Sequence, residues 1–316
     1  MDLAYLRAHP ENLPLLLTHQ RIRETPMPGG STCAASRLTL DDGSSIFAKT
    51  WPGRPDSSVP AGPAEPGLRG SQARSSPPAG FFTAEADGLR WLREPGAVPV
   101  PDVIAATPDL LALEWVEPAP AGPAAADTFG RDLAALHRAG APAFGAPWPG
   151  FIGGLAQDNT EDAGPWPRWF RERRLEPYLR ASADAGALSG ADVALVTRVL
   201  TRIEEYGGAE PPARIHGDLW PGNLLWGAGR VWLIDPAAHG GHRETDLATL
   251  ALFGGPPYLD RILAAYHEAW PLAPGWRARV PVHQLHLMLV HTALFGSGYR
   301  DAVVATATAA ARALPS

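Results

Sequence analysis

The sequence has 316 residues, of which 45% are hydrophobic and 19% are charged, and this composition indicates a globular chain long enough to bury a sizeable core. The formal net charge of −6 argues against a protein that binds nucleic acid through a basic surface, although small anionic ligands can still be held locally. The single cysteine, Cys33, excludes an internal disulfide and favours a reducing compartment.

Two stretches bear on targeting. The first residues, MDLAYLRAHPENL, carry an acid at position 2 and no long apolar run, so we expect no signal peptide. The most apolar later stretch, residues 285–295, is too short to span a bilayer and contains histidine. We therefore expect a cytoplasmic protein without nucleic-acid or membrane partners, and a monomer as the default.

The first third of the chain predicts a hairpin followed by an insertion. The segments ASRLTL (residues 35–40) and SSIFAKTW (residues 44–51) are rich in Ile, Leu, Phe and Thr, and the DDG between them is a turn signal. Residues 52–80 are crowded with Pro, Gly and Ser, which predicts a flexible insertion. Composition alone favours a linker with no further role.

Helix and strand signals follow the insertion. Residues 81–94 predict a helix whose apolar residues fall on one stripe, and Glu85 falls on the same stripe. Residues 109–118, DLLALEWVEP, predict an apolar strand that ends in Glu-Pro. The segment after it, APAGPAAAD, is typical of a connector.

The remainder of the chain is mostly helical by pattern. The first of these helices has its apolar residues on one face, and Gly140 is placed to end it. We therefore predict an α+β fold of two lobes. Their predicted bounds are 1–113 for a small sheet-rich lobe, 114–122 for a connector and 123–316 for a larger helical lobe.

The stretch RIHGDLWPGNLLW (residues 214–226) predicts a polar loop between apolar strands. Asp218 and Asn223 lie on a turn closed by Pro and Gly, and the segments NLLW and RVWLID form a hairpin that ends at Asp235. One place therefore holds two carboxylates and an amide oxygen. Such hard oxygens suit Mg²⁺ together with phosphate oxygens, and a carboxylate beside them suits a base for a hydroxyl nucleophile.

The same spacing, Asp-x4-Asn followed by an Asp after an apolar strand, occurs in the protein-kinase catalytic loop and metal-binding segment. On this template Asp218 contacts the acceptor hydroxyl, while Asn223 and Asp235 hold the metal. The alternative is that Asp218 and Asn223 only satisfy a turn through Asx hydrogen bonds. We expect His216 to pack the loop rather than to carry protons, and Trp220 to serve packing as well.

A phosphoryl-transfer site also needs positive charge on the nucleotide phosphates. Alternation within residues 44–51 points Lys49 inward with Phe47, and Glu85 lies on an apolar helix stripe. Because a buried charge needs a partner, we predict that Lys49 pairs with Glu85. The alternative is a lysine that reaches off an edge strand and a glutamate at a helix edge.

Two further segments are candidates for nucleotide contact. Gly29 and Gly30 precede a strand and would form the turn that covers the phosphates, although GG dipeptides are also ordinary turns. Glu114 and Val116 lie in LEWVEP, which would be the hinge that offers backbone hydrogen bonds to adenine. Cys33, in the glycine turn, is either sensitive to oxidation or a small packing residue.

Three motifs carry a family resemblance. HGDLWPGN (216–223), IDPA (234–237) and GHRETDLATLALFGG (241–255) resemble the fructosamine kinase (ketosamine-3-kinase) family, within the kinases of the aminoglycoside phosphotransferase and protein-kinase-like fold. FAKTW, AEADGLRWL, LEWVE and FIGGLAQDN support the resemblance, which runs from about residue 25 to past residue 300. Other aminoglycoside or choline kinase relatives typically share the His-Gly-Asp and the Asn but not this Trp-Pro-Gly.

The resemblance implies a reaction and a set of roles. The reaction is ATP- and Mg²⁺-dependent phosphorylation of a ketosamine at its sugar 3-hydroxyl, on small molecules or glycated proteins, as a deglycation activity. Asp246, which we expect to begin a helix, would cap and brace the active-site loops. The implied roles are acid/base or orienting residue for Asp218, Mg²⁺ ligands for Asn223 and Asp235, and phosphate-binding lysine and partner for Lys49 and Glu85.

Two departures and an acceptor question remain. The family usually places the acid helix soon after the lysine strand, whereas residues 52–80 intervene here; this insertion either covers the nucleotide or does nothing, and a flexible loop costs little to lengthen. The segment after IDPA has Ala-His where the family often has an aromatic residue. The candidates for acceptor contact, which alternatively pack a core, are Trp166, Trp169, Phe170 and Arg173.

Two other functions compete with a ketosamine kinase. One is a small-molecule kinase of the same fold that acts on an aminoglycoside, choline or another amino alcohol. The other is a non-catalytic nucleotide-binding module that regulates a partner, and the intact set of Lys49, Asp218, Asn223 and Asp235 argues against it.

Overall fold

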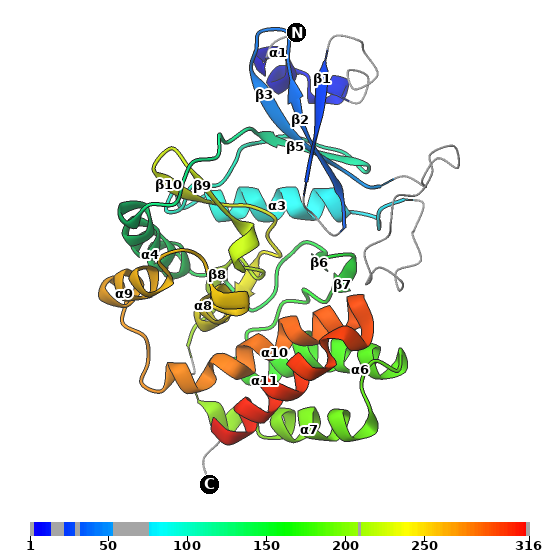
Figure 1. Ribbon diagram of the computed structural model, residues 1–316, viewed down its shortest axis with the longest axis vertical. Coiled ribbons are helices and arrows are strands. Elements are labelled where there is room, and N and C mark those ends of the chain that lie inside the picture. Colours follow the sequence, from blue (N-terminus) through cyan, green and yellow to red (C-terminus); the bar gives the residue numbers. More distant parts are fainter. Residues whose placement is uncertain (1–2, 14–21, 29–31, 53–75, 208–209, 314–316) are drawn as a thin grey trace.

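The computed structural model describes residues 3–13, 22–28, 32–52, 76–207 and 210–313 of the chain (Figure 1). Residues 53–75, the greater part of the predicted insertion, lie outside the described residues, and so do Gly29 and Gly30, which were predicted to cover the phosphates.

The N-terminal part forms a five-stranded antiparallel sheet in the order β1-β2-β3-β5-β4. The predicted hairpin is confirmed, because β2 and β3 pair on either side of the DDG turn, with Lys49 opposite Ala35. The strands are β1 (Arg23–Met27), β2 (Ala34–Thr39), β3 (Ser45–Thr50), β4 (Val103–Ala106) and β5 (Leu110–Glu114).

The two faces of this sheet contact different helices. Ile46 and Ala48 pack into a cluster with Leu6 of α1 (Leu3–Ala8), next to the short 3-10 helix η1 (Pro10–Asn12). Phe47 packs on the opposite side, against the cluster that contains α3 (Phe81–Arg93), the cyan helix under the sheet in Figure 1. Side chains alternate between faces along a strand, so Lys49 lies on the α3 side, as predicted.

The C-terminal part is helical, with three two-stranded sheets. The predicted stop at Gly140 is confirmed, because α4 ends at Arg138 and Gly140 has a left-handed φ of +73°.

The strand pairs are β6 (Gly150–Ile152) with β7 (Leu155–Gln157), β8 (Ala213–Ile215) with β11 (His239–Gly241), and β9 (Leu224–Gly227) with β10 (Arg230–Leu233). The α-helices are α4 (Pro123–Arg138), α5 (Trp166–Phe170), α6 (Glu176–Asp184), α7 (Gly190–Thr201), α8 (Arg243–Leu250), α9 (Leu259–Ala269), α10 (Trp276–Phe295) and α11 (Arg300–Ala313). The other helices are the π-helix η2 (Arg171–Leu175) and the 3-10 helices η3 (Ile203–Tyr206), η4 (Pro221–Asn223), η5 (Leu252–Gly254) and η6 (Gly296–Tyr299).

One hydrophobic cluster joins the sheet-rich and helical parts. It contains Phe82 and Leu89 of α3, Phe129 of α4, and Leu219 and Leu224 from the segment that carries the predicted polar loop. The loop is therefore fixed against the core between the two parts, since buried side chains pack closely. This is the predicted two-lobed α+β arrangement.

Helix α10, the longest helix in the described part of the chain, packs against α6, α8 and α11 (Figure 1). It contains the apolar residues 285–295, which were predicted from the sequence to be too few to cross a bilayer. Among the described residues, no helix is both long and apolar enough to cross a membrane.

Candidate active site

The polar loop, residues 216–223, connects β8 to β9 and depends on one glycine. Gly217 has a left-handed φ of +81°, and a Cβ atom at this position would collide with the carbonyl of Ala237. The loop can therefore lie against the segment that follows Asp235 only with glycine here.

Asn223 links the two predicted acidic residues of the site. Its Nδ2 donates to the Asp218 carbonyl at 2.8 Å, to Asp218 Oδ2 at 3.1 Å and to the Asp235 carbonyl at 3.3 Å. Asp235 follows β10 and has a φ of +52°, a strained conformation for a residue other than glycine. The structure thus brings Asp218, Asn223 and Asp235 together, with more contact than an isolated Asx turn provides.

His216 holds the polar loop from inside. It is fully buried; its Nδ1 accepts from the Asp218 backbone amide at 3.2 Å, so its Nε2 carries the proton and donates to the Ile234 carbonyl at 2.9 Å. Burial lowers the pKa of His216, which keeps the ring neutral. The packing role predicted for His216 agrees with this geometry.

Asp246 fixes the start of the same loop. Its carboxylate accepts from the backbone amides of His216 at 2.7 Å and Gly217 at 2.9 Å, and from His137 Nε2 at 3.1 Å. The expectation that Asp246 begins a helix was wrong by one turn, because α8 begins at Arg243 and the His242 side chain caps it. Asp246 braces the loop but does not cap the helix.

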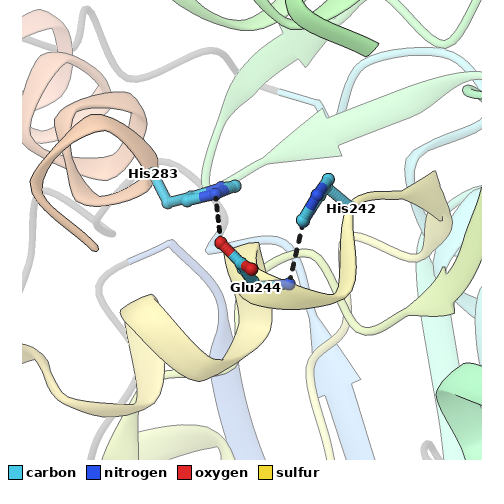
Figure 2. A group of neighbouring side chains, drawn as sticks. All are labelled: His242, Glu244 and His283. Atoms are coloured by element: carbon cyan, nitrogen blue, oxygen red, sulfur yellow. Dashed lines mark hydrogen bonds and ion pairs between the residues drawn. The ribbon is translucent and has the colours of Figure 1, made fainter. Parts of the chain in front are cut away.

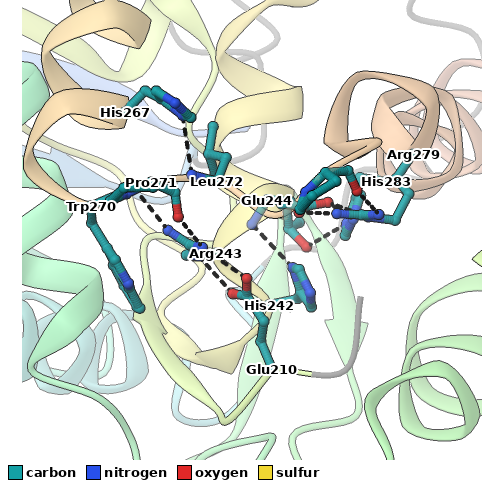
Figure 3. A network of polar contacts seen from close by, with 12 residues as sticks. Glu210, His242, Arg243, Glu244, His267, Trp270, Pro271, Leu272, Arg279 and His283 are labelled. Atoms are coloured by element: carbon teal, nitrogen blue, oxygen red, sulfur yellow. Dashed lines mark hydrogen bonds and ion pairs between the residues drawn. The ribbon is translucent and has the colours of Figure 1, made fainter. Parts of the chain in front are cut away.

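Helix α8 is buried along its whole length and rests on two ion pairs (Figure 3). Arg243 donates to Glu210 at 2.6 and 2.8 Å, and Arg279 donates to Glu244 at 2.7 and 2.6 Å. Burial alone would raise the pKa of Glu244, but the hydrogen bonds from Arg279 and the nearby imidazole of His283 outweigh it and bring the pKa to about 2.

His242, Glu244 and His283 lie close enough to suggest a metal site, with ligand atoms within 4.8 Å of one another (Figure 2). Both carboxylate oxygens of Glu244, however, accept hydrogen bonds from the Arg279 guanidinium, and His242 Nδ1 accepts from the Glu244 backbone amide at 3.2 Å. A cation here would sit beside an arginine that already neutralises the carboxylate. We interpret the cluster as a structural support for α8.

Lys49 lies above the polar loop and contacts two carboxylates. Its Nζ is 3.0 and 2.8 Å from the Glu85 oxygens and 3.1 Å from Asp235 Oδ1. The Lys49 and Glu85 side chains are only 12% and 9% exposed, so the predicted pairing forms and the edge-strand alternative does not apply. Burial would lower the pKa of Lys49, but Asp235 and Glu85 outweigh it and raise the pKa, so the ammonium stays charged.

One cavity of about 460 Å³, a size suited to a small-molecule ligand, is lined by Lys49, Glu85, Asp218, Asn223 and Asp235. The predicted hinge residues Glu114 and Val116 line it too, and the hinge is tied to β9 by a 2.7 Å hydrogen bond from the Ala119 amide to the Trp226 carbonyl. Burial raises the pKa of Asp218, at the floor of the cavity, to about 7, against the opposing effect of the Asn223 amide.

The aromatic residues at the cavity differ from those that the sequence singled out. Trp166, Trp169 and Phe170 are at most 2% exposed within the helical core, so the packing alternative is correct for them, and Arg173 pairs with Asp158. The cavity is lined instead by Trp148, Phe151 and Trp220. Trp148 and Phe151 lie in PWPGF, where flanking Pro and Gly mark a surface loop and offered the signal that was missed.

Trp220 was expected to serve packing, and it does so only in part. Its ring edge packs against Phe253, but the residue is 37% exposed and lines the cavity. A Cβ atom on Gly222 would collide with the Trp220 ring, so the glycine of this loop makes room for the tryptophan.

Cys33 also lines the cavity but is 8% exposed. Burial raises the pKa of its thiol to about 11. A thiol with this pKa is mostly protonated at neutral pH, which favours the packing alternative over oxidation sensitivity.

A two-lobed α+β fold, with a Lys–Glu pair in the sheet-rich lobe above an Asp/Asn loop in the helical lobe, defines a protein-kinase-like phosphotransferase. Residues 72–310 match the family model of fructosamine kinase. The chain belongs to the fructosamine kinase family, and it is a kinase.

Individual relatives agree with this assignment. A candidate fructosamine-3-kinase of Thermobifida fusca has a similar solved structure, with a TM-score of 0.81, 47% identity, and coverage of 92% of this chain and 94% of that one. A probable ketoamine kinase of Thermus thermophilus is 38% identical over 228 residues, or 72% of this chain and 81% of the relative. A choline kinase of Cryptosporidium parvum, at 12% identity and a TM-score of 0.60, shares the fold, with coverage of 98% of this chain and 94% of that one.

Proposed function

We propose that this kinase transfers the γ-phosphoryl group of ATP to the sugar 3-hydroxyl of a ketosamine, such as a fructosamine or ribulosamine on a small amine or a glycated protein. The observation that carries the proposal is the contact of Lys49 with both Glu85 and Asp235, in the cavity that Asp218 and Asn223 also line. Family membership supports the acceptor class.

The nucleotide would bind between the hinge and Lys49. The hinge residues Glu114 and Val116 would offer backbone groups to the adenine, and the Lys49 ammonium would contact the phosphates. Glu85 holds that ammonium in place through two hydrogen bonds, which is the positioning that phosphoryl transfer needs.

The acceptor hydroxyl would meet Asp218. As the hydroxyl oxygen forms a bond to the γ-phosphorus and the bond to the β-phosphate oxygen of ATP breaks, the hydroxyl proton passes to the Asp218 carboxylate and ADP leaves. The raised pKa of Asp218 suits a group that holds a proton during transfer. Phosphorylation at the 3-hydroxyl yields an adduct that releases the amine, which would make the activity a deglycation repair.

The donor set beneath Lys49 fits Mg²⁺. The three hydrogen bonds of Asn223 use its amide nitrogen, so the amide oxygen is left to act as a ligand with the Asp235 carboxylate. These two oxygens would hold the ion, and the ion would neutralise charge on the transferred phosphoryl group.

We therefore predict that chelation of divalent cations abolishes turnover and that added Mg²⁺ restores it, because the single positive charge of Lys49 does not replace a divalent ion on the transferred phosphoryl group. The measurement is ADP release in chelator followed by titration with Mg²⁺, with Ca²⁺ as the comparison ion. Full activity in chelator would contradict the assignment of Asn223 and Asp235.

An acceptor panel tests the substrate class. We expect phosphate transfer to fructosyl- and ribulosyl-lysine, with the phosphate located on the sugar 3-oxygen by NMR. Transfer to an aminoglycoside or choline with none to a ketosamine would overturn the proposal in favour of another small-molecule kinase. Absence of transfer to every acceptor would favour a non-catalytic nucleotide-binding module.

A further inference from the structure

A buried arginine outside the roles described above contacts the wall of the cavity. Arg174, in the π-helix η2, is 0% exposed, yet among the described residues no carboxylate lies within ion-pair distance of its guanidinium. Burial of a charge without an opposite charge is unfavourable, so a compensating arrangement is expected around it.

Neutral oxygens of one short segment provide that arrangement. Nη1 donates to the Asp158 carbonyl at 2.6 Å, and Nη2 donates to Asn159 Oδ1 at 2.8 Å. Of the two orientations of the Gln157 amide, the one that turns its oxygen to the guanidinium accepts from Nη2 at 3.0 Å and from Nε at 3.3 Å. The guanidinium also lies over the Trp169 ring, 4.3 Å from its centroid. The planar Arg174 guanidinium therefore holds residues 157–159 in place through several hydrogen bonds from one rigid group.

Asn159 transmits this arrangement to the cavity, which it lines. Its Nδ2 donates to the Trp148 carbonyl at 3.4 Å, and its backbone carbonyl accepts from the Ala146 amide at 2.9 Å. A Cβ atom on Gly150 would lie 2.7 Å from Asn159 Cγ, so this amide packs directly on the strand that follows Trp148. Trp148 and Phe151 are aromatic residues of the cavity wall on that segment.

The backbone around Arg174 is also unusual. Residues 171–175 form a π-helix between α5 and α6, and such turns are rare and occur frequently at functional sites. Here two successive residues reach the same segment, with Arg173 Nη1 on the Asp158 carboxylate and Arg174 on the Asp158 carbonyl.

We infer that Arg174 is a positioning residue that sets the acceptor side of the cavity, acting through Asn159 on the segment that carries Trp148 and Phe151. This inference rests on the proposed function only in taking that wall as the acceptor side. Lys49 and the hinge make no hydrogen bond to this network among the described residues, although Trp148 and Phe151 pack against Trp91 and Phe81 of α3. The Michaelis constant for the acceptor should therefore depend on Arg174, while that for ATP should not.

The test uses two variants of the full chain. Arg174→Lys keeps the charge but removes the fork, and Asn159→Asp keeps an oxygen for the guanidinium but removes the donor to Trp148. Each is expected to raise KM for the acceptor about tenfold, because the wall that meets the acceptor is no longer held in position, with KM for ATP changed less than about twofold. The matched control is Arg300→Lys, since Arg300 is held by two hydrogen bonds to Asp192 at 2.7 and 2.9 Å and lies outside the cavity lining.

The acceptor used in this test is the compound that the wild-type protein phosphorylates fastest in the acceptor panel. If that compound is not a ketosamine, the proposed function is overturned, but the role of Arg174 can still be tested with it. If Arg174→Lys does not fold, Asn159→Asp decides. The inference is overturned if the folded variants leave KM for the acceptor unchanged, if KM for ATP rises equally, or if Arg300→Lys produces the same change.

Discussion

At the scale of single residues, Lys49 has a larger part in the geometry of the candidate active site than the sequence pattern predicted, because it contacts Asp235 as well as Glu85. The chain contains one lysine among its 27 cationic Lys and Arg residues, and that lysine is the one that contacts Glu85 and Asp235. The guanidinium of arginine is a planar group with several fixed donors, whereas the lysine ammonium is a compact charge on a flexible side chain. Lys49 therefore places a point charge between the two carboxylates.

This allows a direct labelling experiment. An ATP analogue that carries a reactive acyl phosphate should acylate Lys49 alone among side chains, because no other ε-amine exists and Lys49 lies in the cavity. Peptide mass spectrometry reads the site, excess ATP should suppress the label, and Lys49→Arg should show none. Side-chain labelling that resists excess ATP would contradict nucleotide binding beside Lys49.

Lys49→Arg should also lower kcat/KM by a factor of about 100 or more, the size of effect seen when one electrostatic contact to the transition state is lost. Steady-state rates at several ATP concentrations measure it. Activity within a few-fold of the wild type would show that charge alone suffices at this position.

At the scale of elements, α8 supports the polar loop through the hydrogen bonds that Asp246 accepts from the loop backbone. Asp246 of α8 holds the loop amides, while Glu244 of the same helix is paired with Arg279, and their side chains are 2% and 7% exposed, respectively. Loss of one partner in such a buried pair leaves an uncompensated charge, at about 3–5 kcal/mol. The loop geometry should therefore depend on a contact that lies outside the cavity.

The lowered pKa of Glu244 gives a pH dependence with a defined sign. Its folded-state pKa of about 2 lies below the ordinary value of 4.5, so its contribution to the free energy of unfolding is present above pH 4.5 and is lost as the pH falls towards 2. The contribution should be roughly 3 kcal/mol. Glu244→Gln should remove this part of the acid dependence and destabilise the protein at neutral pH.

Chemical denaturation between pH 2 and pH 7 measures both effects. Glu205→Gln is the matched control, because Glu205 pairs with Arg202 at the exposed surface. An acid dependence that is identical in wild type and Glu244→Gln would contradict the role given to the buried pair.

At the scale of the whole molecule, local patterns predicted the fold and much of the site geometry. The hairpin around Lys49 and the grouping of Asp218, Asn223 and Asp235 follow from turn residues and alternation within about 20 residues of one another. The Lys49–Glu85 contact crosses the insertion, and it was predictable because each charge lay on an apolar face.

The features that the sequence did not predict are the buried position of Arg174 and the choice of aromatic residues at the cavity, and both depend on tertiary packing. Nothing local distinguishes Arg174 from its neighbours Arg171 and Arg173, and only the folded chain shows which of them is enclosed. Trp220 and Trp166 are likewise equivalent by pattern, although one lines the cavity and the other is buried in the core. Exposure of a given aromatic residue is set by elements distant in sequence, such as α10, whose His283 stacks on Trp166.

The activity proposed for the Asp218 site is phosphorylation of a ketosamine. The most direct measurement compares wild type and Asp218→Asn on fructosyl-lysine with Mg²⁺ and ATP, by product mass spectrometry together with ATP binding. We predict phosphorylated product with the wild type, and a loss of at least about 1,000-fold in kcat with ATP binding retained in the variant, because the group that takes the hydroxyl proton is gone. Full turnover by Asp218→Asn, or no product with the wild type, would contradict the claim.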